Sequence, residues 1–164
     1  MGRFEPWKSL PRLNRVFVLI VLSLVLIAGS LFLANQKDSD IIVVTFPNGR
    51  EIEAEVADTP EKLLFGLAFR EGLPPNSGML YIFETSDRHR RHTKGFKIPV
   101  DMIWVDESRH VVYLVESADP CPQDPCPLYG PPPENARYVI QTPAGFIRQE
   151  GLVPGMELRF TLRL

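Results

Sequence analysis

The sequence contains little of what metal centres and catalytic sites are usually built from. It has two cysteines and three histidines among 164 residues, and the cysteines lie far along the chain from the histidines. Either group would need further ligands nearby to hold a metal, and none accompanies it. The sequence also lacks a G-x-S-x-G motif, a glycine-rich phosphate loop and any Ser/His/Asp set with the spacing of a triad. We therefore expect no metal and no cofactor.

Clustered positive charge is missing from most of the chain. Four of the 18 Lys and Arg residues lie among the first 15 positions, and from Gln36 onward 14 remain against 19 Asp and Glu. Contacts with a phosphate backbone require clustered basic side chains. We therefore exclude nucleic acid as a partner.

One long uncharged run, Val16–Ala34, dominates the N-terminal part of the chain. At about 1.5 Å per residue a helix of this length spans roughly 28 Å, close to the hydrocarbon thickness of a bilayer. The basic residues before it predict a cytoplasmic N-terminus. We expect four segments: a cytoplasmic segment at 1–15, a single transmembrane anchor or uncleaved signal at 16–34, a linker at 35–40, and an extracytoplasmic domain at 41–164.

A cleavable signal peptide is the alternative interpretation of this run. Ala28-Gly29-Ser30 offers a small-x-small site, but the apolar residues continue through Leu33, beyond the usual length of a signal core. The length favours an anchor that is not cleaved. Both interpretations place the domain outside the cytoplasm, in the periplasm or the extracellular space.

Seven segments of this domain predict strands. In the last of them Leu158, Phe160, Leu162 and Leu164 alternate with polar residues, which is typical of an antiparallel sheet with one buried face. Asn48-Gly49, between the first two segments, suits a type I′ hairpin turn. The seven segments are 41–46, 51–57, 79–83, 100–106, 110–117, 136–142 and 157–164.

One short helix is expected after the second strand. Asp58 or Thr59 can cap it, Pro60 suits its first turn, and Leu63, Leu64 and Leu67 form an apolar stripe. Gly72 and Pro74 are expected to end it. Seven strands and one helix predict a mainly β fold, an antiparallel β-sandwich or a partly closed barrel.

The two cysteines, Cys121 and Cys126, lie in a proline-rich segment. Because proline fixes φ and removes an amide donor, we expect an ordered surface loop there. Outside the cytoplasm the two thiols should form a disulfide that staples this loop. A redox-active pair is the alternative, but the spacing is not C-x-x-C.

The densest charge run extends from Arg88 to Lys94. One interpretation is an anion or carboxylate site in which His89 and His92 act as acid–base groups or ligands. The other is a solvated loop between two strands, which is favoured because charge runs usually face water.

Asp101 lies inside an apolar stretch, between Val100 and Met102. A carboxylate there either faces solvent on an alternating strand or is buried with a partner, because burial alone is costly. Arg70 and Lys94 are the candidate partners. The group forms a structural ion pair or part of a ligand pocket.

Several motifs together resemble the domain-of-unknown-function 192 family, also called uncharacterised protein family 0127. Gly66–Arg70 followed by Leu73-Pro74 and Gly78–Phe83 is similar to G-L-M-x-R … L-p … G-M-L-F-x-F. Lys94–Asp101 is similar to the end of the motif F-W-M-K-G/N-x-x-x-P-L-D. Three positions depart from the pattern: His92-Thr93 replace Trp-Met, and Ala68 replaces Met. The resemblance covers residues 41–164.

The resemblance implies a compact jelly-roll-like β-sandwich with a short helix, exported behind a signal or anchor. It implies no established activity. Arg70, Lys94 and Asp101 occupy the polar positions of its motifs.

Three functions remain open on the sequence alone. The leading hypothesis is a non-enzymatic module that binds a small molecule or glycan, or assists the envelope, through Arg70, Lys94 and Asp101 with His92 at the rim. The second is a hydrolase acting on envelope polysaccharide or peptidoglycan, with Asp101 and a histidine as acid and base. The third is a structural or protein-interaction module, for which the sequence names no partner.

Overall fold

The computed structural model describes residues 12–34 and 41–161 of a chain that divides into two units, Met1–Asp38 and Ser39–Leu164. The first unit contains helix α1 (Arg12–Ala34), whose large apolar side chains between Val16 and Ile27 are exposed. Within the described ranges, no helix combines the length and the apolar character that a membrane span requires. The predicted linker, 35–40, lies outside the described residues.

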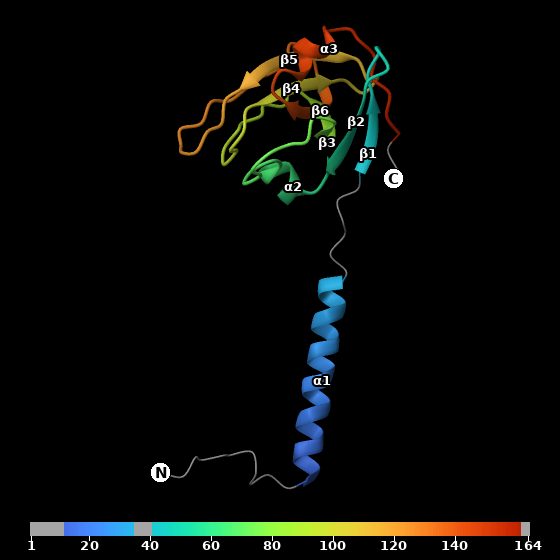
Figure 1. Ribbon diagram of the computed structural model, residues 1–164, viewed down its shortest axis with the longest axis vertical. Coiled ribbons are helices and arrows are strands. Elements are labelled where there is room, and N and C mark those ends of the chain that lie inside the picture. Colours follow the sequence, from blue (N-terminus) through green and yellow to red (C-terminus); the bar gives the residue numbers. More distant parts are fainter. Residues whose placement is uncertain (1–11, 35–40, 162–164) are drawn as a thin grey trace. The chain divides into compact units, whose positions relative to one another are not determined.

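The second unit is built on one six-stranded sheet (Figure 1). The order across the sheet is β1-β2-β3-β6-β4-β5. The strands are β1 (Ile41–Thr45), β2 (Glu51–Ala57), β3 (Ser77–Asp87), β4 (Val100–Val105), β5 (Val111–Ala118) and β6 (Ala136–Pro143). The prediction of a mainly β fold is confirmed.

The sheet is mixed rather than antiparallel. β2 and β3 pair in parallel, whereas the other four neighbouring pairs are antiparallel. The connection between β2 and β3, residues 58–76, is long enough to carry the chain back to the start of the sheet before β3 begins. Such a crossover allows parallel pairing, which a tight hairpin cannot provide.

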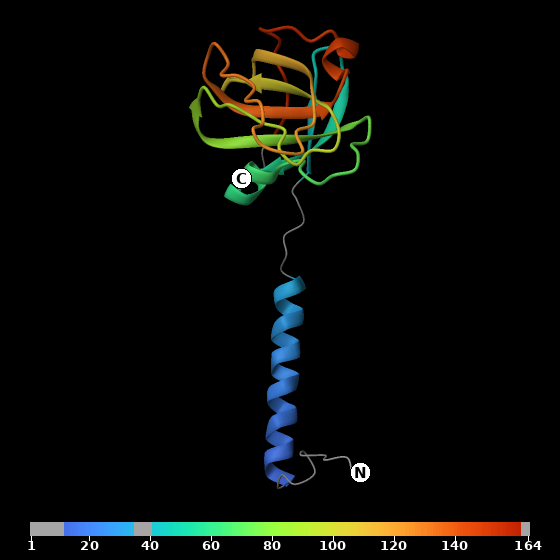
Figure 2. The same ribbon diagram turned by 90° about the vertical axis from the view of Figure 1, so that its left-hand side faces the viewer.

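Both faces of the sheet are buried along its central strands, whereas one face of β1 is exposed. Successive side chains of a strand point to opposite faces. In β3, Leu80 packs into one core cluster and Met79 and Tyr81 into the other. All six residues of β4 are buried. The expectation of one wet face therefore fails for the central strands. Figure 2 shows how strongly the sheet curls.

Two short helices complete the unit, and in Figure 1 α3 lies above the sheet and α2 below it. Helix α2 (Pro60–Phe65) begins as predicted: Thr59 is its N-cap, and its hydroxyl accepts a hydrogen bond from the Lys62 amide at 3.3 Å. It ends at Gly66, earlier than the predicted stop at Gly72. Helix α3 (Phe146–Glu150) was not predicted, so the expectation of a single helix in this domain is wrong.

Two further predictions need correction. A type I′ turn requires a positive φ at both central residues. Gly49 has a φ of 83°, but the φ of Asn48 is not positive, so the first turn is not of type I′. The last predicted strand forms only isolated bridges, at Glu157 and Arg159. Its alternation still holds where it is described, since Leu158 and Phe160 are buried. Leu162 and Leu164 lie outside the described residues.

The contacts that hold this unit together are its own. Both core clusters and all six strands lie between Ile41 and Phe160. A fragment covering residues 36–164 therefore contains everything that the fold requires.

Candidate functional site

Arg70 forms a two-pronged ion pair with Glu55 of β2. Its two terminal guanidinium nitrogens each lie 2.6 Å from one carboxylate oxygen of Glu55. This hydrogen bonding, opposed by partial burial, raises the pKa of Arg70 above its usual value. Paired forks of this kind are strong and geometrically specific. Arg70 thus fixes the chain after α2 against the sheet.

Asp101 is fully buried in β4 and accepts two backbone hydrogen bonds. Its two carboxylate oxygens take the amide protons of Ser117 and Ile147, each at 2.7 Å. Ile147 lies in the first turn of α3, where amides have no partner within the helix. The carboxylate therefore holds α3 and the end of β5 in place. The expected pairing of Asp101 with Arg70 or Lys94 is not formed among the described residues.

Lys94 and His92 lie on a different part of the surface, in the loop before β4. The Lys94 ammonium is exposed and lies 2.5 Å from a carboxylate oxygen of Asp124. The Nδ1 atom of His92 accepts a hydrogen bond from the Lys94 amide at 3.2 Å. Partial burial, together with the positive charges of Arg91 and Lys94, lowers the pKa of His92. The four predicted site residues therefore do not form one cluster.

The charge run from Arg88 to Lys94 is only partly solvated. Arg91 is 7% exposed, and its guanidinium lies over the Tyr81 ring at 3.9 Å. One of its terminal nitrogens donates to the Leu63 carbonyl of α2 at 2.9 Å. Carbonyls at a helix C-terminus lack partners within the helix, so this contact stabilises α2. The favoured interpretation as a solvated loop is thus wrong for Arg91, and Thr93 is also buried.

His92 and Lys94 line a groove with a volume of about 320 Å³. The groove is formed by three segments: α2 with the residues that follow it, the loop before β4, and the disulfide loop. Most of its lining is apolar, which is typical of small-molecule sites. The lining residues are Leu64, Phe65, Ala68, Phe69, His92, Lys94, Gly95 and Pro122.

The apolar wall of the groove is exposed rather than packed in the core. Leu64, Phe65 and Phe69 all have more than half of their surface accessible, and Phe69 reaches 69%. The rings of Phe65 and Phe69 lie 6.4 Å apart. The sequence predicted Leu64 as part of an apolar stripe with Leu63 and Leu67; Leu67 is buried, whereas Leu64 is exposed.

Phe69 has an unfavourable backbone conformation. Its φ is 67°, in the left-handed region that bulky residues rarely adopt. The structure holds it there: the Phe69 amide donates to the Gly95 carbonyl at 2.9 Å, and Arg70 is fixed by its fork to Glu55. Such outliers cluster at functional sites.

Gly66 allows the turn that leads to Phe69. It has a φ of 50°, and a Cβ atom added there would lie 1.8 Å from the Tyr81 hydroxyl oxygen. That hydroxyl is engaged with Gln141 at 2.6 Å. Position 66, directly after α2, therefore accommodates only glycine.

The second wall of the groove belongs to the disulfide loop. Cys121 and Cys126 are joined, as predicted, with their sulfur atoms 2.04 Å apart. The loop is bound to the segment before β4: the Gly95 amide donates to the Cys121 carbonyl at 2.9 Å, and the Thr93 hydroxyl donates to the Asp119 carbonyl at 2.7 Å. These contacts place Pro122 beside Lys94.

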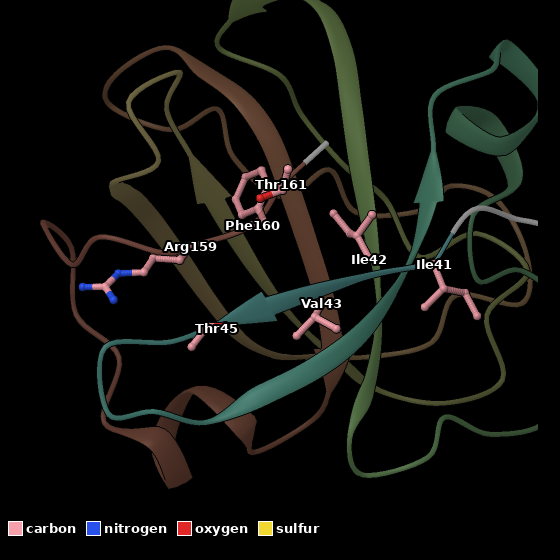
Figure 3. Close-up of a pocket in the computed structure, with 7 residues that line it drawn as sticks. All are labelled: Ile41, Ile42, Val43, Thr45, Arg159, Phe160 and Thr161. Carbon is pink, nitrogen blue, oxygen red and sulfur yellow. The ribbon is translucent and has the colours of Figure 1, made fainter. Parts of the chain in front are cut away.

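Another hollow, of about 390 Å³, lies between β1 and residues 159–161 (Figure 3). Its sides are formed by the edge strand of the sheet and by a segment that reaches β1 through a bridge between Thr45 and Arg159. It adjoins Ile41 and Thr161, beyond which the chain is not described. It brings together no titratable side chain other than Arg159, so we assign no site to it.

The model of the domain-of-unknown-function 192 family, described as "Uncharacterized ACR", matches residues 43–160. The match covers more than half of the chain and nearly the whole second unit. The chain belongs to this family. No curated protein matches it.

Two solved structures share the fold of this family member. One is a "putative transcription regulator" from Sinorhizobium meliloti 1021, with 23% identity, a TM-score of 0.67, and coverage of 77% of this chain and 98% of that one. The other is a protein of unknown function from Novosphingobium aromaticivorans DSM 12444, with 23% identity, a TM-score of 0.64, and coverage of 74% and 84%. At this level of identity the similarity concerns the fold alone.

The departures from the family's motifs lie at the groove or directly beside it. Ala68 and His92 line it, and Thr93 is buried next to His92. The groove is thus where the sequence of this family member differs from the motifs that it otherwise resembles.

Proposed function

We propose that this chain is a membrane-anchored extracytoplasmic module that binds a small ligand in the groove between α2 and the disulfide loop. The observation that carries the proposal is the exposed, strained Phe69 beside Phe65, in a groove that Lys94 and His92 also line. Strained backbone conformations cluster at functional sites. Exposed apolar patches mark surfaces that bind ligands or partners. Arg70 and Asp101, which the sequence placed in the site, support the surrounding structure instead.

The anchor is proposed from the uncharged run at 16–34 and the basic residues before it. A disulfide in the domain agrees with an oxidising compartment. We also propose that the curled sheet is a jelly-roll-like sandwich and that the groove lies on the outer surface of this sandwich. Membrane fractions washed with alkaline carbonate should retain the full chain, and protease added outside the cytoplasmic membrane should cleave the domain. Release by the wash would contradict the anchor without bearing on the groove.

Ligand binding is tested by a thermal-shift screen of fragment 36–164 against sugars, nucleotides, carboxylates and aromatic compounds. A compound that raises the melting temperature of the native fragment, but not of a Phe65→Ser/Phe69→Ser variant, supports the proposal. If every compound that binds stabilises both proteins equally, the groove is not the site.

A hydrolase is less well supported, because both carboxylate oxygens of Asp101 are engaged by backbone amides. A protein-interaction module is the second candidate, since Leu64, Phe65 and Phe69 form an exposed apolar surface. Photocrosslinking distinguishes protein interaction from small-ligand binding, with a photoreactive residue at position 69 of the full chain in its native membrane. A protein adduct that is lost on Phe65→Ser favours protein interaction. Absence of any protein adduct favours a small ligand.

A further inference from the structure

The polar side chains that line the groove offer hydrogen-bond donors to a ligand. Lys94 offers three N–H donors and no acceptor. His92 is the other polar side chain among the lining residues, which include no carboxylate, amide or hydroxyl. A ligand group that meets both must therefore be an acceptor.

The contact between His92 and the backbone fixes which ring nitrogen carries the proton. Its Nδ1 accepts the Lys94 amide proton at 3.2 Å, so in the neutral ring the hydrogen is on Nε2. The pKa of His92 is lowered by burial and by the neighbouring Arg91 and Lys94 charges, which agrees with a neutral ring. His92 thus presents a donor to the groove.

The Lys94 ammonium already pairs with a carboxylate of this chain. Asp124 lies 2.5 Å from it, and more than half of each side chain is exposed. Exposed pairs of this kind contribute little, because water and salt screen them. A carboxylate bound in the groove can therefore take the place of Asp124 at small cost, while also meeting apolar surface that Asp124 does not reach.

The remaining lining defines the other end of the ligand. Leu64, Phe65, Phe69 and Pro122 supply apolar and aromatic surface to the same groove as the two donors. A volume of about 320 Å³ is at the lower end of the range for ligand sites. The groove therefore matches a short body, one aromatic ring or a few methylene groups.

We propose that the groove binds a small amphipathic carboxylate, whose anionic group replaces Asp124 at Lys94 and whose aromatic or aliphatic body lies against Phe65 and Phe69. This inference rests on the proposed binding function and adds the chemical class of the ligand. The carboxylate can belong to a free acid or to the C-terminus of a peptide, since both present the same chemistry.

The experiment measures the affinity of fragment 36–164 for 3-phenylpropionate and for its neutral analogue 3-phenylpropanol by NMR titration. We expect the carboxylate to bind about tenfold tighter, because charge-assisted hydrogen bonds are among the stronger polar contacts. Lys94→Gln should remove this preference and leave the alcohol unaffected. Asp124→Asn should increase the affinity for the carboxylate, because it frees Lys94.

Lys97→Gln is the matched control. Lys97 is an exposed lysine three residues away that pairs with Glu71 and does not line the groove. It makes the same change in net charge, so a general electrostatic effect would appear in both variants, whereas a specific contact is lost only with Lys94.

The outcomes separate the inference from the function on which it rests. Equal affinities for the acid and the alcohol, or equal effects of the two lysine variants, would overturn the carboxylate assignment and leave ligand binding standing. Binding of neither probe, with no shift at Phe65 or Phe69, would overturn both. A tripeptide that ends in phenylalanine then distinguishes a peptide terminus from a free acid. Tighter binding of the tripeptide than of 3-phenylpropionate favours a peptide terminus, and weaker binding favours a free acid. The same tripeptide with an amidated C-terminus is the control for the carboxylate contact.

Discussion

The amide of Phe69 donates a hydrogen bond to the carbonyl oxygen of Gly95 at 2.9 Å, which joins the chain after α2 to the loop that carries Lys94. The segment after α2 and the loop before β4, which both line the groove, are thus directly hydrogen-bonded. The same bond holds Phe69 at a φ of 67°, with its ring exposed. The apolar wall and the charged rim therefore depend on each other for their positions.

Replacement of Phe69 by glycine separates stability from binding. A left-handed conformation costs an ordinary residue about 1–2 kcal/mol and glycine almost nothing. Because the ring is largely exposed, Phe69→Gly should leave the free energy of unfolding unchanged or raise it by about 1 kcal/mol. Ligand affinity should fall, as measured by urea unfolding and NMR titration of fragment 36–164.

Arg109→Gly provides the comparison, since Arg109 has a φ of 69° and lies outside the groove lining. It should relieve similar strain without changing ligand affinity. A Phe69→Gly protein that binds as tightly as the native fragment would show that the exposed ring has no part in recognition.

Asp101 should be essential for stability. Asp101→Ala removes the acceptor of two amides and leaves the buried Ile147 amide without a partner, for a cost of about 3 kcal/mol. Asp124→Ala, at an exposed carboxylate, should change the free energy of unfolding by less than about 0.5 kcal/mol. Comparable losses in the two variants, measured by urea unfolding, would contradict the role given to Asp101.

The role of Asp101 also shows what the sequence could and could not predict. Its position in an apolar stretch correctly indicated a carboxylate that needs a partner. The partners could not be inferred, because they are backbone amides: one belongs to Ser117, and the other to Ile147, 46 residues away in a five-residue helix. That helix has too few residues for an apolar period, so α3 escaped prediction as well.

Local patterns predicted the strands better than their pairing. Strand β2 was predicted with its observed ends because its residues alternate between charged and apolar from Glu51 to Val56. A strand within β3 was predicted at 79–83, but its parallel pairing with β2 could not be, since pairing across residues 58–76 depends on the path of the whole connection.

The groove was only half predictable. Lys94 and His92 stood out as charged or titratable residues, but Leu64 had the spacing of a core residue. Leu67 of the same stripe is buried, whereas Leu64 is exposed and lines the groove, and the spacing alone does not distinguish the two. Arg91 was hidden in a charge run, and no local signal distinguishes it from the exposed Arg90.

Stability should depend on pH through His92. Its pKa is lowered in the folded state, so below the unfolded value of about 6.5 the unfolded chain binds more protons than the folded one. The contribution to stability is therefore complete above that pH and is lost as the pH falls below it. His92→Asn keeps an acceptor for the Lys94 amide and should flatten the curve of melting temperature between pH 8 and 5.5. Parallel curves for the two proteins would contradict this prediction.

Opening of the disulfide should act on the groove as well as on stability. A ring of this size contributes about 2 kcal/mol by restricting the unfolded chain, so Cys121→Ser/Cys126→Ser should lose about that much. The affinity for 3-phenylpropanol should fall too, because Pro122 lies within the disulfide ring and lines the groove. Unchanged affinity for this probe in the folded variant would show that the loop does not shape the site.

The central claim is that the groove beside Phe69 is the ligand site, and an NMR titration of labelled fragment 36–164 with 3-phenylpropionate tests it most directly. The account predicts saturable shifts confined to the amides of residues 64–69, 92–95 and 121–126. Shifts that instead gather along β1 and residues 159–161, or that do not saturate anywhere, would contradict it.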